Sequence, residues 1–201
     1  MKRNRVLLIH GIDDTVVVFD TMSAYLKQRG WDVYSLDLIP CNGDCGLDLL
    51  ARQVADYVTK TFRPSELFDL VGFSMGGIIS RYYVQRLGGI SRVERFITIS
   101  SPHHGSWLGY ARQNPGCRQQ RPESDFLQDL NRDAAMLARL NFTSIWTPFD
   151  LMILPANSSS MPVGKEITVP ILVHSWMVRD SQSLRLVAQE LMEPLRNKYE
   201  A

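Results

Sequence analysis

The sequence predicts an α/β fold with a mostly parallel sheet of about six strands and helices on both faces. Short apolar runs of strand length alternate with amphipathic stretches of helix length, which is the pattern of parallel strands joined by crossover helices. The chain has 201 residues, of which 45% are hydrophobic, so it can bury one sizeable core. No internal repeat or linker divides it, and we expect residues 1–201 to form a single domain.

Six segments are predicted to be strands, because each is a short apolar run that fits between two helical stretches. They comprise residues 5–9, 32–37, 67–73, 95–99, 144–147 and 168–173.

Four longer stretches are predicted to be helices, because apolar residues recur on one face of each. The first ends at Gly30, which suits the left-handed position after a helix. The second ends before Pro64, and the last is interrupted late by Pro194. These helices comprise residues 19–29, 47–62, 75–87 and 182–199.

The stretch from residue 100 to residue 141 breaks this alternation. It is rich in Gly, Pro, Gln and Arg, with short helical candidates only at residues 125–130 and 134–140. About forty residues of loop and short helix in one domain indicate a functional loop or a disordered insert. We expect it to form part of the wall of a binding site and not a large separate lid.

The charge balance argues against nucleic acid as a partner. The chain has 22 Lys and Arg against 21 Asp and Glu, a formal net charge of +1, and no long run of one sign. No apolar run approaches the roughly 18 to 20 residues that cross a bilayer, so we predict no transmembrane segment. The apolar run at residues 6–9 is also too short for a signal peptide.

Three cysteines, Cys41, Cys45 and Cys117, favour a reducing compartment. Their odd number and wide spacing do not indicate a disulfide framework, so we expect a cytoplasmic protein. Cys41 and Cys45 could form a redox pair or half of a metal site, but no second pair or nearby histidine completes either. We therefore predict cysteines in surface loops and no bound metal.

The sharpest local signal is a G-x-S-x-G motif centred on Ser74. It lies between the strand predicted to end at Phe73 and the helix predicted to begin at Met75. Gly72 and Gly76 leave the space that lets such a strand-to-helix turn close tightly. The turn lifts the serine hydroxyl above the carboxyl edge of the sheet, where ligands bind in open parallel sheets. We predict that Ser74 is a nucleophile.

A serine nucleophile needs a base, and the chain has four histidines. His174 directly follows the last predicted strand, so it should stand at the same edge as the nucleophile. His10 precedes a glycine in a pair that usually has a structural role. His103 and His104 lie in the long loop and remain alternatives. We predict His174 as the general base.

The acid that orients this histidine should also stand at the end of a strand. Asp150 occupies that place, just past the strand predicted at residues 144–147. Asp180 is too near His174 in the sequence to be the expected partner. Three further aspartates are interpreted more simply as solvated charges on short helices: Asp125, Asp129 and Asp133.

A tetrahedral intermediate also needs hydrogen-bond donors for its oxyanion. The N–H of Met75 belongs to the residue after the nucleophile. The N–H of Ile12 follows His10-Gly11 at the end of the first strand. We predict that these two main-chain groups form the oxyanion hole.

Motifs spread over nearly the whole chain resemble those of one enzyme family: His10-Gly11-Ile12, Gly72-Phe73-Ser74-Met75-Gly76-Gly77, Ser101-Pro102-His103-His104-Gly105-Ser106, Phe149-Asp150 and His174. The family is the small α/β-hydrolase lipases and esterases, especially the minimal bacterial lipases. The nucleophile, acid and base also follow one another in the α/β-hydrolase order. The resemblance implies a single α/β-hydrolase domain with minimal or no cap. The chain departs from the family at Asp13 and Asp14, where a small glycine-rich continuation is common.

The predicted function is hydrolysis of carboxylic esters by a serine hydrolase, and the resemblance points to lipid acyl esters. Trp107, Leu108 and Leu151 are predicted to line an apolar acyl site. The chemistry needs no metal or organic cofactor. Transient contact with a lipid surface is expected, and the oligomeric state is not indicated.

Two alternatives remain from the sequence. An acyltransferase or a thioesterase would use the same triad with another acceptor or leaving group. A non-catalytic binding protein of this fold usually lacks one member of the triad, whereas all three positions are filled here.

Overall fold

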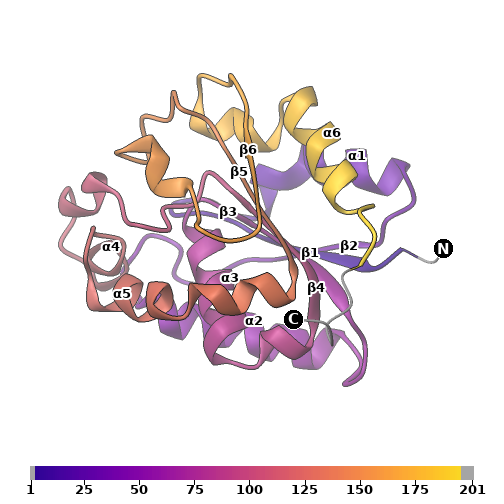
Figure 1. Cartoon of the computed structure of the whole chain (residues 1–201). Helices are drawn as coiled ribbons and strands as arrows, with labels where there is room; N and C mark the ends of the chain where they lie inside the picture. The colour runs from indigo at the N-terminus through magenta and orange to yellow at the C-terminus, as the bar shows by residue number, and fades with distance from the viewer. Residues whose placement is uncertain (1–2, 196–201) are drawn as a thin grey trace.

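The computed structural model describes residues 3–195 and contains one parallel sheet (Figure 1). Among the described residues, six strands form this sheet in the order β2-β1-β3-β4-β5-β6, and every neighbouring pair is parallel. The predicted fold class is therefore confirmed. The strands are β1 (Arg5–Ile9), β2 (Val33–Leu36), β3 (Phe68–Phe73), β4 (Val93–Ile99), β5 (Asn141–Trp146) and β6 (Lys165–Thr168).

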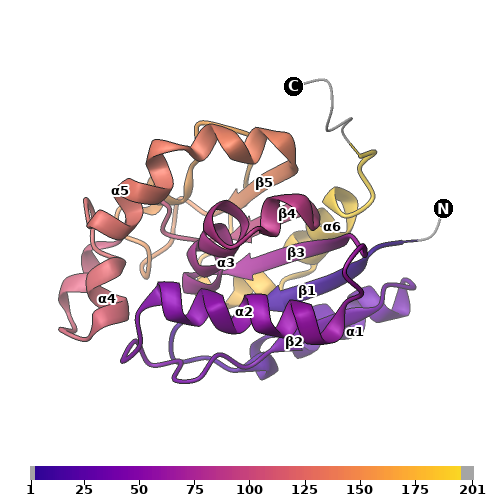
Figure 2. The ribbon, with the colours of Figure 1, turned by 90° about the horizontal axis from the view of Figure 1, so that it is seen from below.

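Helices cover both faces of the sheet, as predicted. Figures 1 and 2 show α1 and α6 on one face and α2 to α5 on the other. The α-helices are α1 (Asp20–Gln28), α2 (Leu47–Thr61), α3 (Met75–Arg86), α4 (Pro115–Gln119), α5 (Asp125–Arg132) and α6 (Ser181–Glu190). The 3₁₀ helices are η1 (Val16–Phe19), η2 (Gly89–Ser91), η3 (Trp107–Tyr110), η4 (Ala134–Arg139), η5 (Ala156–Ser159) and η6 (His174–Val178).

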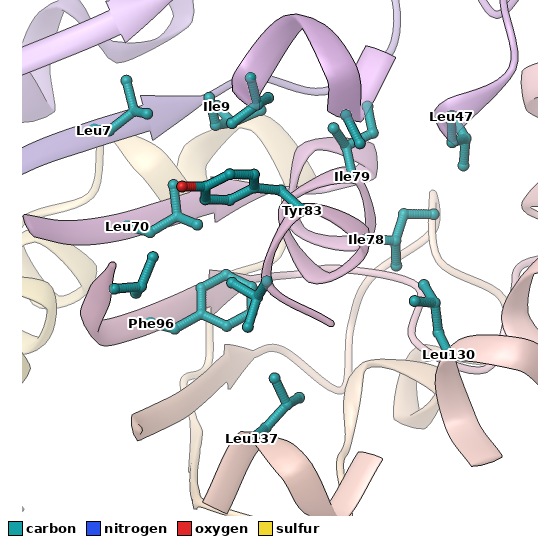
Figure 3. Packing of buried hydrophobic residues seen from close by; sticks show 14 of the residues in the cluster. Leu7, Ile9, Leu47, Leu70, Ile78, Ile79, Tyr83, Phe96, Leu130 and Leu137 are labelled. Atoms are coloured by element: carbon teal, nitrogen blue, oxygen red, sulfur yellow. The ribbon is translucent and has the colours of Figure 1, made fainter. Parts of the chain in front are cut away.

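Side chains of the buried strands belong to two apolar clusters, one on each face of the sheet. Successive side chains of a strand point to opposite faces, so Val6 and Leu8 join the cluster with α1 and α6. Leu7 and Ile9 join the cluster with α2 and α3, where they face Tyr83 (Figure 3). Burying each such side chain contributes about 1.5–3 kcal/mol. The two clusters fix the sheet, and with it the positions of the loops at its carboxyl edge.

Two predicted elements near the C-terminus are wrong. The last strand covers Lys165–Thr168 and not residues 168–173. The register with β5 ends at Thr168, followed by one bond from the Val169 N–H to the Trp146 carbonyl oxygen at 2.9 Å. The last helix ends at Glu190, well before residue 199. Residues 196–199 of that predicted helix lie outside the described part of the chain. The fifth strand is longer than predicted and begins at Asn141.

The long segment of residues 100–141 packs on α3. Arg86 forms ion pairs with Asp129 at 2.8 Å and Asp133 at 2.7 Å. Arg81 is fully buried and donates to the carbonyl oxygen of Leu130 at 2.9 Å. Burial lowers the pKa of Arg81 to about 9. These bonds tie α5 to the helix that follows Ser74. Across residues 3–195, no helix is both long and apolar enough to cross a membrane.

Candidate active site

Ser74 stands on a sharp turn between β3 and α3. Its backbone has φ 53° and ψ −126°, a positive φ that L-residues seldom adopt. The Ser74 N–H donates to the carbonyl oxygen of Ile99 at 2.8 Å, which fixes the turn against β4. Ser74 is 7% exposed and lines a cavity at the carboxyl edge. This conformation is the one that the G-x-S-x-G motif predicts.

The glycines of the motif are required by close packing. A Cβ atom on Gly72 would lie 2.5 Å from the Cα of Gly77 in α3. A Cβ atom on Gly76 would overlap the carbonyl oxygens of Ile9 and His10. The start of α3 can therefore press against β1 only because these positions lack side chains.

Asp150 and His174 are hydrogen-bonded to each other. Nδ1 of His174 lies 2.7 Å from Oδ2 of Asp150. The other oxygen, Oδ1, accepts from the N–H groups of Met152 at 2.8 Å and Ile153 at 3.0 Å. Burial raises the pKa of Asp150, but the hydrogen bonds from His174 and the two N–H groups lower it by more. The carboxylate is therefore ionised and held in one orientation.

The ring of His174 packs beside the nucleophile turn. Its centroid lies 4.8 Å from that of Phe73, the residue before Ser74. The His174 side chain is 12% exposed. With Nδ1 bonded to Asp150, Nε2 is the nitrogen left to exchange a proton with a hydroxyl. This arrangement holds the His174 ring next to the turn that bears Ser74.

His174 reaches this place by a different route from the predicted one. It begins η6, and residues 169–173 separate it from the end of β6. The Thr147 hydroxyl, just past β5, donates to the carbonyl oxygen of Ile171 at 2.7 Å and holds this segment near Asp150. Sequence reasoning gave Thr147 no role, because a hydroxyl that supports a loop has no distinctive spacing.

His103 is buried within a hydrogen-bond network. Its Nδ1 lies 3.4 Å from a guanidinium nitrogen of Arg81, and its Nε2 lies 2.9 Å from the Thr98 hydroxyl. Because a guanidinium can only donate, Nδ1 accepts and Nε2 carries the hydrogen. Burial, and then the charge of Arg81, holds the pKa of His103 well below its ordinary value. The ring is a neutral packing group.

The other two histidines are also engaged elsewhere. Nε2 of His10 accepts from the N–H of Leu38 at 3.0 Å, which leaves the hydrogen on Nδ1 for the Gly11 carbonyl at 2.8 Å. This is the structural role expected for His10. His104 is exposed, and its Nδ1 lies 3.3 Å from the carbonyl oxygen of Ser158.

The remaining candidate acids have structural contacts. Asp129 and Asp133 pair with Arg86, as described above. Asp180 caps α6, where its side chain accepts from the N–H of Gln182 at 2.7 Å. Asp125 is exposed in the first turn of α5.

A cavity of about 210 Å³ adjoins Ser74. Its lining includes Ile12, Leu108, Met152 and Ile153. Met75 is buried as the first residue of α3. Of the two residues predicted to supply oxyanion donors, Ile12 therefore lines the cavity and Met75 directly follows Ser74.

The three residues predicted to bind substrate occupy different places. Leu108 lines the cavity at Ser74, whereas Trp107 lines a separate groove of about 1040 Å³ together with Trp146. Leu151 is 74% exposed. None of the three is part of the buried core.

Cys117 is buried in α4 and lines the cavity at Ser74, so its prediction as a surface loop residue is wrong. Burial raises the pKa of its thiol. Cys41 and Cys45 are half-buried, and all three are free thiols. The described residues contain no group of three or more His, Cys, Asp or Glu side chains placed to hold a metal ion.

Comparison with known proteins places this chain in a family. The chain matches the palmitoyl protein thioesterase family over residues 5–121, more than half of its length. Its fold is similar to that of the mature lipase BlEst2 from Bacillus licheniformis, with 15% identity and a TM-score of 0.77. That match covers 94% of this chain and 92% of the other.

Two larger enzymes have a similar fold. Lipase B from Aspergillus fumigatus matches at 17% identity and a TM-score of 0.82, over 99% of this chain and 55% of that one. Phospholipase PlaB from Legionella pneumophila matches at 14% identity and a TM-score of 0.79, over 97% of this chain and 60% of that one. The chain thus spans little more than half of each. At these identities the likeness establishes the fold alone.

Proposed function

Because the chain belongs to the palmitoyl protein thioesterase family of α/β-hydrolases, we propose that it hydrolyses fatty acyl esters with Ser74 as nucleophile, His174 as base and Asp150 as orienting acid. The 2.7 Å hydrogen bond between His174 and Asp150, beside the turn that bears Ser74, carries the proposal. The protein is a hydrolase by its family, and the assignment of roles is our inference.

The first half of the reaction forms an acyl-enzyme. Nε2 of His174 takes the proton of the Ser74 hydroxyl as Oγ attacks the acyl carbon. Asp150 fixes Nδ1–H and stabilises the imidazolium that results. When the tetrahedral intermediate collapses, the imidazolium gives its proton to the leaving alcohol. Water then attacks the acyl-enzyme with the same base, which releases the acid and restores the serine.

The oxyanion of each tetrahedral intermediate needs two donors in fixed positions. We assign the N–H groups of Ile12 and Met75, which belong to the loop after β1 and to the start of α3. The packing of Gly76 against β1 supports this assignment, because it brings those two segments together. Losing one such donor lowers kcat by about 100- to 1000-fold in enzymes of this type.

An apolar rim around the carboxyl edge supports a lipid substrate and transient contact with a lipid surface. Large apolar side chains on the loops that follow β4, β5 and β6 are between 49% and 74% exposed: Trp107, Tyr110, Phe149, Leu151, Leu172 and Trp176. Exposed apolar patches of this kind mark binding surfaces for lipids or partners. Tryptophan and tyrosine favour the boundary between water and lipid.

A thioesterase activity is the second candidate, and the family match favours it. The same triad would attack a thioester, with a thiol in place of the alcohol. The panel of substrates below separates the two. Cytoplasmic location and a single domain over residues 1–201 remain parts of the proposal, the first supported by the free thiols.

The experiment that tests the proposal begins with a fluorophosphonate probe, which labels activated serines. Wild-type protein should be labelled and Ser74→Ala should not. Ser74→Ala should also lose about 10⁴-fold or more of ester turnover, with an unchanged circular dichroism spectrum. A Ser74→Ala variant that keeps half of the activity would refute the assignment, and an unlabelled, inactive wild type would favour a non-catalytic binding protein.

Chain length then tests the substrate class. Specificity constants for p-nitrophenyl esters should rise from acetate past butyrate, because each buried methylene adds about 0.8 kcal/mol. Leu108→Ala should flatten this rise more than Trp107→Ala, because Leu108 lines the cavity at Ser74. A steady fall from acetate onward would indicate a short-chain esterase. Faster turnover of palmitoyl thioesters than of matched oxygen esters would indicate a thioesterase.

A further inference from the structure

Two neighbouring aspartates after β1 differ in what surrounds their carboxyl groups. Asp13 is exposed, and its carboxylate forms an ion pair with Arg112 at 2.6 Å. Asp14 is half-buried, and no hydrogen bond to its carboxyl is found within residues 3–195. Asp14 was given no role above, although it follows the segment that bears Ile12.

The carboxyl of Asp14 lies close to the nucleophile. Its Oδ2 is 3.3 Å from the point that a Cβ atom on Gly11 would occupy. Oγ of Ser74 is 3.4 Å from the same point. The two oxygens therefore both border the space beside Gly11, which has no side chain to separate them.

The titratable groups that face Asp14 are His10, His174, Arg179 and Asp13. Burial raises the pKa of Asp14, while the two histidines and Arg179 lower it by less. Arg179 is exposed, so solvent weakens its attraction. An ionised Asp14 thus presents a negative charge to the site that no hydrogen bond offsets.

We propose that Asp14 is a specificity-determining residue that favours neutral acyl esters over esters bearing a negative charge within about one aromatic ring of the scissile bond. The proposal rests on the proposed function, because it requires Ser74 to be the attacking group. A like charge at this range, in a partly desolvated site, opposes binding of the anionic substrate and its transition state. Discrimination of about ten-fold is expected at moderate salt.

The test compares two esters that differ mainly in charge. We would use 4-sulfophenyl butyrate, which is anionic, and 4-sulfamoylphenyl butyrate, which is neutral and of similar shape. The quantity measured is the ratio of kcat/KM for the anionic ester to that for the neutral ester. Asp14→Asn should raise this ratio about ten-fold over wild type. Asp14→Glu keeps the charge and should leave the ratio near the wild-type value.

Asp56→Asn is the matched control. Asp56 is exposed on α2, so this variant changes the net charge equally without touching the site. Its ratio should stay within about two-fold of wild type, because solvent and salt screen the charge of an exposed carboxylate. If Asp14→Asn and Asp56→Asn behave alike, or if Asp14→Asn leaves the ratio unchanged, the proposal is wrong.

A second measurement uses the wild-type protein alone. Raising NaCl from about 0.05 M to about 0.5 M should increase the ratio, because salt screens the repulsion. A ratio independent of salt would overturn the proposal even if Asp14→Asn did not fold. Labelling of Ser74 by the fluorophosphonate probe is scored separately, so failure of the proposed function is distinguished from failure of the charge discrimination.

Discussion

Two buried carboxylates at opposite edges of the sheet respond differently to burial. Asp150, at the carboxyl edge, is 3% exposed, and Asp69, near the amino end of β3, is 0% exposed. Burial raises the pKa of both groups. The pKa of Asp150 nevertheless lies below its ordinary value, whereas that of Asp69 rises to about 6. Burial alone therefore does not decide the charge state of a carboxyl group.

The two groups differ in the depth of their burial and in the hydrogen bonds that they accept. Asp150 accepts three bonds of 2.7 to 3.0 Å, two of them from backbone N–H groups. Asp69 accepts from Asn4 at 3.0 Å and from Arg95 at 3.2 to 3.3 Å. Shorter bonds to the ionised form stabilise it more. The opposing charge of Arg95 lowers the pKa of Asp69, but by less than burial raises it.

The same strand links the two edges. β3 carries Asp69 near its start and ends at Phe73, directly before Ser74, whereas Asp150 follows β5 at the carboxyl edge. Ligands of open parallel sheets bind at the carboxyl edge. We infer that Asp150 is held ionised for chemistry and that Asp69 ties the amino edge together.

The largest expected effect is a difference in catalytic activity between variants of Asp150 and of Asp69. Asp150→Asn should lower kcat by about 10⁴-fold, because an amide cannot hold His174 in the required tautomer. Asp69→Asn, the matched change at the other edge, should keep at least half of the activity. Steady-state ester hydrolysis on both variants, with circular dichroism to confirm folding, measures the contrast. Equal losses in the two variants would show that Asp150 has no greater role in activity than Asp69.

The sequence predicted the fold well where strands are buried and poorly where they are not. Buried β1 and β3 are apolar runs that were placed within one residue. β6 is an edge strand with mostly exposed residues, Lys165–Thr168, so it carries no hydrophobic signal. The apolar run after it fills the core with Val169 and Ile171, although the register of β6 with β5 already ends at Thr168. Hydropathy predicts which residues are buried, and in this segment the buried residues are not those that form the strand.

The triad residues could be predicted because chain order and strand ends constrain them. The structure brings Asp150 and His174 into contact, while the roles of Ser74, Asp150 and His174 in catalysis remain predictions. Asp14 and Thr147 could not be found from the sequence, because their neighbours come from distant segments that only the tertiary fold brings together.

A smaller effect concerns stability. The folded-state pKa of Asp69, about 6, exceeds the ordinary value of 3.8, so the folded protein binds the proton more tightly than the unfolded chain between these values. The contribution of Asp69 to the unfolding free energy is therefore greatest at low pH and is lost as the pH rises toward 6 and above. Relative to Asp69→Asn, wild type should lose up to about 3 kcal/mol of unfolding free energy between pH 4 and about pH 7. Urea unfolding at several pH values measures this, and a gap that is constant with pH would contradict it.

The smallest effect tests the role of the cation beside Asp69. Arg95 is the charged partner of Asp69, with an N–O distance of 3.2 Å, and its side chain is 12% exposed. Without that cation the pKa of Asp69 should rise by about one further unit. In Arg95→Gln the pH-dependent loss of unfolding free energy should therefore continue to higher pH and become about 1.4 kcal/mol larger. Arg95 also donates to the carbonyl oxygen of Glu193, and losing that bond lowers stability equally at every pH. The two contributions separate when Arg95→Gln is made in the Asp69→Asn background, where only the pH-independent loss should remain. If the effect of Arg95→Gln on the unfolding free energy still depends on pH in the Asp69→Asn background, another group causes that dependence and Arg95 does not lower the pKa of Asp69.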